Sequence, residues 1–183
     1  MSLIYLLSSL PLLKFGADPG ITPTGFADVC REQLCAADAR AAESLLNGEM
    51  SDHPFARAWQ DRETILRNAV ARHRARLYGA DAAHWLRHAK GCDSRIENLV
   101  EDAFQESDPL QREDELDRIR WSVADELQGP DPLCKNAVFA YAVKLRVLTR
   151  RAERDTKTGT GHFEQLAEIR PADGADAKPQ NES

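Results

Sequence analysis

Apolar residues recur at helical spacing over most of the chain, and the pattern is clearest between Asp108 and Gly129. Asp108-Pro109 is an N-cap signal followed by proline at the first helical position, where the missing N–H costs nothing. The apolar stripe that follows consists of Leu116, Ile119, Val123 and Leu127. Glycine is a typical residue just after the end of a helix. The pattern therefore predicts one long helix that ends at Gly129.

A second long helix is predicted between Asp131 and Arg154. Asp131-Pro132 repeats the cap signal, and the apolar positions behind it are Cys134, Ala137, Val138, Tyr141, Leu145 and Leu148. Two antiparallel helices with such stripes need further helices to bury them. We therefore expect an all-α fold, an irregular helical bundle built on these two long antiparallel helices.

Three earlier segments carry helix signals at their ends. Thr22 offers a hydroxyl cap to a helix that is expected to run to about Leu34. A short helix is expected over Ala36–Leu46, beginning near Asp38 and stopping at Asn47-Gly48. A longer helix is expected over Phe55–Tyr78, followed by Gly79. Its inner side is expected to consist of Trp59, Ile65, Leu66, Ala69, Val70, His73 and Leu77.

Other segments give weaker signals. Ser2–Leu10 fits a strand or a helix, and Pro11 ends it either way. The glycines and proline that follow predict a loop up to Thr22. A weaker helix is expected to start at Asp81 and to falter at Gly91-Cys92-Asp93, and Ser94 restarts a helix that runs to about Phe104.

The end of the chain is expected to lose regular structure. Thr156–Gly161 is predicted to be a flexible turn, and His162–Ile169 a last short helix. Residues 170–183 contain no apolar side chain larger than alanine, and we expect them to form a disordered tail. These predictions give one helical domain over residues 1–169 and a tail over 170–183.

Composition and charge exclude some classes of function. The 183 residues carry a formal net charge of -6, which argues against a general nucleic-acid binder but leaves local basic patches open. The apolar N-terminus resembles the core of a signal peptide, but it has no basic residues before it and is too short to span a bilayer. We expect a buried core segment there, with no targeting element and no membrane insertion.

Three features bear on metal, redox or catalytic chemistry. The cysteines, Cys30, Cys35, Cys92 and Cys134, form no C-x-x-C pair and fit reduced, mostly buried thiols; a five-residue spacing in one helix disfavours a Cys30–Cys35 disulfide. His84, His88 and Cys92 have metal-compatible spacing, but Gly91 and Asp93 break the helix before the cysteine. No phosphate loop or nucleophile motif is present, and we expect no catalytic, cofactor or metal residues.

An arginine-rich stretch of the Phe55–Tyr78 helix contains Arg62, Arg67, Arg72, Arg74 and Arg76. It fits a phosphate-binding stripe or a set of intramolecular ion pairs, and the acidic net charge favours ion pairs. Carboxylates are abundant nearby: Glu97, Glu101, Asp102, Glu106, Glu113, Asp114, Glu115 and Asp117. Without a Glu-x-x-His pair they do not predict a di-iron site, and we expect them to partner Arg67, Arg74, Arg120 and Arg151.

Several segments, in this order and spacing, resemble a family of small bacterial proteins usually encoded with A/V-type ATPases. The segments are YLLSSLPLLKFG, TPTGFADVC, RNAVARHRARLYG, EDELDRIRW and AYAVKLRVLTRR, and the resemblance runs from about Ile4 to Leu166. The family resembles a reduced form of the rotor collar of these ATPases, the all-helical component between the rotary axle and the membrane ring. This chain is about half as long as a typical collar protein and lacks its three-part repeat.

The resemblance implies a non-catalytic subunit that couples the central axle to the membrane rotor ring. Its partners would be other ATPase subunits, and it would lie in the cytoplasm, peripheral to the inner membrane. Two alternatives stay open, a transient assembly or regulatory factor of the ATPase and a free-standing helical enzyme that uses the arginine and carboxylate cluster.

The positions carried over from the family are interpreted as a polar network that clamps the long helices. They are Arg67, Asn68, Arg74, Asp117, Arg120, Trp121, Tyr141, Lys144 and Arg151. His73 departs from the family pattern. We expect Trp121 to be buried between the long helices and Arg120 to pair with a carboxylate. Part of the N-terminal segment is expected to dock a partner, with Tyr5, Leu6 and Leu10 as the docking residues.

Overall fold

Local capping signals set most of the helix boundaries in the computed structural model. Thr22 caps α2 (Pro23–Gln33) by accepting a hydrogen bond from the Gly25 N–H at 3.1 Å. α3 (Ala36–Asn47) ends at Gly48, which has a φ of 74° that favours glycine. α4 (Pro54–Tyr78) ends in the same way at Gly79. The helices predicted from these signals are confirmed, and α3 begins at the predicted Ala36 and extends to Asn47.

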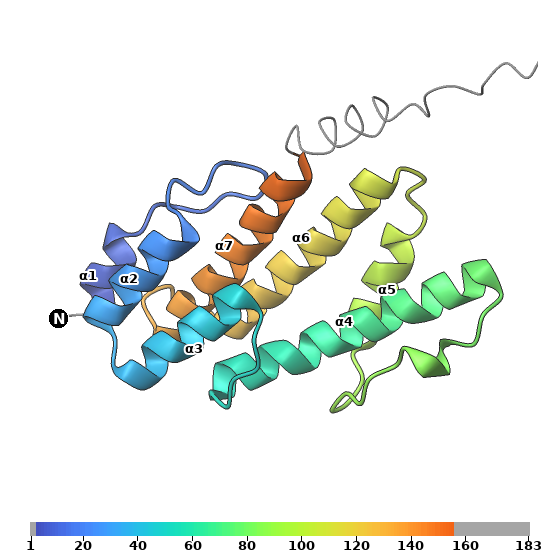
Figure 1. The fold of residues 1–183 in the computed structure, drawn as a ribbon, viewed down its shortest axis with the longest axis horizontal. Coiled ribbons are helices and arrows are strands. Elements are labelled where there is room, and N and C mark those ends of the chain that lie inside the picture. The colour runs from blue at the N-terminus through green and yellow to red at the C-terminus, as the bar shows by residue number, and fades with distance from the viewer. Residues whose placement is uncertain (1–2, 156–183) are drawn as a thin grey trace, which may run out of the picture. The chain divides into compact units, whose positions relative to one another are not determined.

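The structure describes residues 3–155, and every element within them is helical (Figure 1). This confirms the prediction of an all-α fold for the described part. The chain divides into two units, Met1–Arg151 and Ala152–Ser183, and the description below concerns the first. The predicted turn at Thr156–Gly161, the short helix at His162–Ile169 and the tail at 170–183 lie outside the described residues.

The apolar N-terminus forms a short helix, α1 (Leu3–Ser9), which decides between the strand and helix interpretations. Leu6 is completely buried in the core, and Leu3, Leu7 and Leu10 pack against its edge. Tyr5 points the other way and is 62% exposed. The expected core segment is therefore an amphipathic helix with only one buried face.

The segment between α4 and α5 (Ser94–Ala103) corrects the sequence prediction. In place of a weak α-helix it forms a single 3-10 turn, η1 (Ala82–His84), followed by irregular chain. The buried Asn68 side chain on α4 bonds the Arg87 backbone twice: Nδ2 donates to the carbonyl at 2.7 Å, and Oδ1 accepts from the N–H at 2.9 Å. These bonds replace the helical hydrogen bonds of that residue, so tertiary contact overrides local propensity.

α6 (Pro109–Gln128) begins as predicted, because Asp108 accepts a hydrogen bond from the Leu110 N–H at 2.9 Å. The last helix of the described residues, α7 (Lys135–Asp155), starts later than predicted. Asp131 accepts from the Leu133 N–H through its side chain and from the Cys134 N–H through its carbonyl, which closes a turn. The cap signal at Asp131-Pro132 therefore makes a turn in place of the first helical turn.

The core of the first unit draws on all seven α-helices. Its largest fully buried side chains include Phe26, Phe139, Leu6, Leu45, Leu66, Ile96, Leu116 and Leu145. α4 is the longest helix and packs against both α5 and α6. Along its inner side Trp59, Ile65, Leu66 and Ala69 are buried, Val70 and His73 are half-buried, and Leu77 is exposed, contrary to the prediction. Leu77 lies in the last turn of α4, beyond the edge of the core.

Candidate functional site

The most concentrated polar structure in the core is a set of ion pairs that joins α4, α6 and α7. Asp117 on α6 is 0% exposed; its carboxylate accepts from Arg120 Nη1 at 3.0 Å and pairs with Arg150 on α7. Arg120 Nε also donates to Glu63 on α4 at 3.0 Å. Glu63 in turn accepts from Arg67 Nε at 2.8 Å. We call Glu63, Arg67, Asp117, Arg120, Arg146 and Arg150 the arginine cluster.

Electrostatics within the arginine cluster favour the charged forms of Glu63 and Arg120. Burial would raise the pKa of Glu63, but Arg120 and Arg67 outweigh it and hold that pKa below its ordinary value. Burial would lower the pKa of Arg120, but Glu63 and Asp117 raise it. Glu63 and Arg120 therefore both remain ionised, because the charge of each offsets the effect of burial on the other.

Arg146 on α7 is the cation of this cluster without a carboxylate partner among residues 3–155. Its guanidinium lies against Gly48, where a side chain would collide with it. Burial and the neighbouring Arg150, Arg67 and Arg120 lower the pKa of Arg146. The Nε of Arg150 is also buried, and it has no hydrogen-bond partner in the described part of the chain. The arginine cluster thus holds four guanidinium groups and two carboxylates, which leaves an excess of positive charge.

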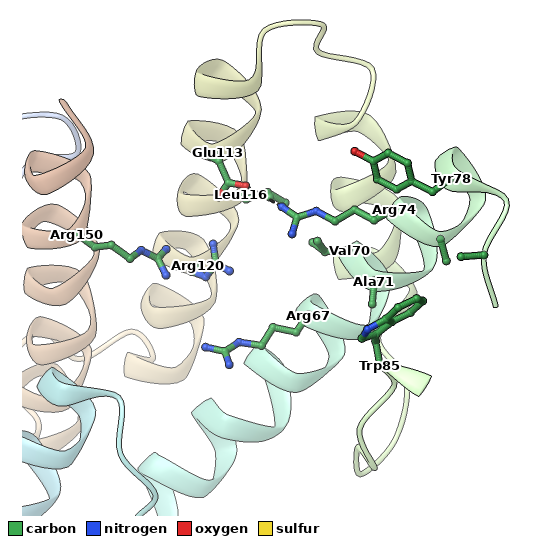
Figure 2. A pocket seen from close by; sticks show the side chains of 12 residues that line it. Arg67, Val70, Ala71, Arg74, Tyr78, Trp85, Glu113, Leu116, Arg120 and Arg150 are labelled. Carbon is green, nitrogen blue, oxygen red and sulfur yellow. Dashed lines mark hydrogen bonds and ion pairs between the residues drawn. The ribbon is translucent and has the colours of Figure 1, made fainter. Parts of the chain in front are cut away.

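A cleft of about 580 Å³ opens beside the arginine cluster (Figure 2). Val70, Ala71 and Leu116 form an apolar floor, and Tyr78 and Trp85 stand at its far end. Figure 2 shows Arg67, Arg120 and Arg150 pointing toward one another from three helices. The cleft is therefore apolar along its floor and cationic at one end.

Arg74 crosses this cleft from α4 to α6. Its Nη2 donates to Glu113 at 3.2 Å, and both side chains are substantially exposed. An exposed ion pair of this kind contributes little to stability, because water screens it. Arg74 is therefore available to exchange its partner without a large cost to the fold.

The other residues expected in one polar network make separate contacts. Asn68 binds the Arg87 backbone, and the Tyr141 hydroxyl donates to the Pro11 carbonyl at 3.0 Å. Lys144 pairs with Asp125, and Arg151 pairs with Asp114. The structure thus brings together Arg67, Asp117 and Arg120 and distributes the rest over other parts of the bundle.

Trp121 is half-buried, which corrects the expectation of a buried indole. Its ring meets Phe15 edge-on at 5.6 Å, and Lys144 Nζ lies 5.2 Å from the ring centroid. Successive helical residues point about 100° apart. Because Arg120 takes the core-facing direction, Trp121 turns toward the loop that carries Phe15.

Several members of the site were not found from the sequence. Glu63 lies four residues before Arg67, a spacing that favours an ion pair, and this signal was available. Arg150 and Arg146 gave no such signal, because their contacts join distant helices. Asp38 is a separate buried carboxylate, whose pKa is lowered mainly by a hydrogen bond from Lys135.

The metal and thiol candidates are dispersed. His84 ends η1, while His88 and Cys92 lie in irregular exposed chain, and residues 3–155 hold no group of three or more potential metal ligands. Cys30 alone among the four free thiols is buried, and burial raises its pKa to about 12. The expectation of mostly buried thiols is therefore wrong. Cys30 lies in α2, whereas Cys35 is the N-cap residue before α3, so the two do not share one helix.

The three expected docking residues of the N-terminal segment do not share one surface. Tyr5 is exposed and Leu10 is half-buried, but Leu6 is in the core and is not accessible to a partner. Residues 3–155 contain no helix with the length and hydropathy needed to cross a bilayer. No family model, curated protein or solved structure matches this chain.

Proposed function

We propose that this chain is a non-catalytic helical subunit of a bacterial A/V-type ATPase, which couples the central axle to the membrane rotor ring. The resemblance of its sequence segments to proteins encoded with such ATPases supports the assembly. The arrangement of its charges supports the non-catalytic role, because Asp117 and Glu63 both bind Arg120 within the fold. The single observation that carries the proposal is this interhelical ion-pair set, which ties three helices together.

A coupling protein has to transmit torque, so it needs a stiff frame. We propose that α6 and α7 supply an antiparallel frame. Along α6, Asp114, Asp117 and Asp125 pair in that order with Arg151, Arg150 and Lys144 of α7, whose numbers run in the opposite direction. Paired positions along both helices resist sliding of one helix past the other. The protein would bind other ATPase subunits at the cytoplasmic face of the inner membrane.

Reconstitution of the ATPase with and without this chain tests the proposal. We expect a fixed stoichiometry in the purified complex, and ATP hydrolysis that continues without ion movement when the chain is left out. A chain required during assembly but absent from the finished complex would favour an assembly factor. Lack of any association with the ATPase would contradict both roles.

Tyr5→Asp tests whether the exposed face of α1 takes part in assembly. Because Tyr5 is exposed, the variant should fold, which circular dichroism checks first. We expect weaker incorporation into the complex than that of the wild type. Leu6→Asp is the matched control for the core side of the same helix, and it should fail to fold because it buries a carboxylate without a partner.

A further inference from the structure

The cleft beside the arginine cluster combines an excess of positive charge with two exposed aromatic side chains. Its lining contributes four arginines, Arg67, Arg74, Arg120 and Arg150, but one carboxylate, Glu113. This local excess of positive charge occurs in a chain whose net charge is -6. At its far end, Tyr78 is 84% exposed and Trp85 is 58% exposed.

Arg67 and Arg150 have N–H donors that make no hydrogen bond among residues 3–155. Arg67 uses Nε for Glu63, and its two terminal nitrogens make no hydrogen bond among residues 3–155. Arg150 uses Nη2 for Asp117, and its Nη1 has no such partner within the same residues. Both guanidinium groups line the cleft and are about one-third to one-half exposed. A guanidinium with free, partly desolvated donors binds carboxylates strongly and in a fixed geometry.

The apolar floor of the cleft determines which kind of group can lie beside an anion bound by the arginines. Val70, Ala71 and Leu116 offer an apolar surface directly beside Arg67 (Figure 2). Among the described residues, no glycine-rich loop or helix N-terminus lines the cleft to supply the backbone N–H groups that phosphate sites use. An apolar side chain next to a carboxylate fits this surface better than a phosphate compound does.

We propose that this cleft docks an acidic segment of a partner protein. A glutamate or aspartate of the segment binds Arg67 and Arg150, and a neighbouring leucine, isoleucine or phenylalanine lies on the floor. Tyr78 and Trp85 cover the apolar side chain from the end of α4 and from the loop after it. This inference rests on the proposed function in one respect, the existence of a protein partner, and it names the chemistry of that partner.

A phage-displayed library of random short peptides, screened on the full chain, tests the proposal. We expect enrichment of peptides in which acidic residues stand next to large apolar ones. The affinity of an enriched peptide should fall steeply as salt is raised, because the contact is electrostatic and partly exposed. Failure to enrich any peptide, or enrichment of basic peptides, would overturn the proposal.

After the screen, the affinity of an enriched peptide is measured for two matched variants, Arg67→Ala and Arg95→Ala. Both arginines are partly exposed and ion-paired, but Arg95 binds Glu126 away from the cleft. For an enriched peptide we expect Arg67→Ala to weaken binding on the order of tenfold, as loss of a charge-assisted hydrogen bond does. Arg95→Ala should leave binding unchanged, and equal effects of the two variants would contradict the proposal.

Tyr78→Ala keeps the test valid if Arg67→Ala disturbs the fold. Its side chain is almost fully exposed, so the variant should melt like the wild type and still bind the peptide several-fold more weakly. The unchanged affinity of a folded Tyr78→Ala variant would overturn the assignment of the apolar end.

Failure of this inference differs from failure of the proposed function. An Arg67→Ala variant that assembles into the ATPase and couples it normally would leave the subunit role intact and remove the cleft from it. Enriched acidic peptides together with no association with the ATPase would support the cleft and reject the subunit role.

Discussion

Asp117 shows how strongly a single residue is constrained by its surroundings. Its carboxylate is fully buried, and two guanidinium groups from two helices bind it. Burying a charge costs several kcal/mol unless partners compensate for the lost hydration, and well-packed apolar residues would often be no less stable. The ion pairs therefore do not by themselves make this protein stable. Because of these ion pairs, the stability of the fold depends on the presence of every charged partner of Asp117.

Asp117→Ala should lower the free energy of unfolding on the order of 3–5 kcal/mol, because it leaves Arg120 and Arg150 charged without their shared partner. Urea unfolding monitored by circular dichroism measures this change. Asp125→Ala is the matched control, since Asp125 is an exposed residue of the same helix that pairs with Lys144, and it should cost about 0–1 kcal/mol. Similar costs for the two variants would show that the burial of Asp117 does not matter.

The sequence predicted part of this arrangement from local spacing. Asp117 and Arg120 lie three residues apart in one helix, and Arg120 does pair with carboxylates in the structure. Glu63 on α4 binds Arg120 across a separation of 57 residues, and Arg150 on α7 binds Asp117 across 33 residues. Separations of this size leave no pattern in the sequence. Contacts within a helix follow from its period, but contacts between helices depend on packing.

At the scale of elements, boundaries were predictable where a side chain caps a helix from within a few residues. Thr22 and Asp108 are such caps, and both accept the expected backbone hydrogen bonds. The prediction failed where a distant group competed for the backbone. Asn68 captures the Arg87 backbone from 19 residues away, so the segment after η1 forms no α-helix.

Asn68→Ala should free this segment, because Arg87 loses both backbone hydrogen bonds to the side chain. We expect faster amide hydrogen exchange at Arg87 and faster proteolysis between η1 and α5. The free energy of unfolding should fall by about 1–3 kcal/mol, as expected when buried hydrogen-bonding groups lose their partners. Hydrogen exchange followed by mass spectrometry measures the local effect.

Asn68→Asp separates the two bonds in the same experiment. Aspartate keeps the oxygen that accepts from the Arg87 N–H, but it loses the amide that donates to the carbonyl. Its effect on exchange should lie between those of the wild type and Asn68→Ala. Exchange at Arg87 that is unchanged in both variants would mean that other contacts hold the segment.

For the whole molecule, the net charge hides the distribution of charge. A value of -6 argues against binding to polyanions in general, yet α4, α6 and α7 bring arginines together at one cleft. The sequence showed the arginines of α4 as a stretch, but their convergence with Arg120 and Arg150 requires the packed fold. In the proposed complex, a chain that is acidic overall and cationic at one cleft would discriminate between acidic partners by shape as well as by charge.

The paired carboxylates also make the stability of the whole molecule depend on pH. The pKa of Asp38 is lowered by its bond to Lys135, and the pKa of Glu63 is held down by Arg120 and Arg67 against the effect of burial. A group whose pKa is lower in the folded protein stabilises it above the unfolded pKa, here 3.8 for Asp38 and 4.5 for Glu63. That stabilisation is lost as the pH falls through the folded pKa values.

We therefore expect the urea midpoint to be nearly constant just above these values and to fall steadily once the pH drops below about 4.5. Glu63→Gln should be less stable than the wild type at pH 7, because Arg120 and Arg67 lose a charged partner. It should also lose less stability on acidification, since it lacks one of the carboxylates whose protonation destabilises the fold. Wild-type and Glu63→Gln curves that fall in parallel below that pH would show that Glu63 does not link folding to protonation. In the Glu63→Gln variant, the remaining dependence of the urea midpoint on pH comes from Asp38 and the other carboxylates.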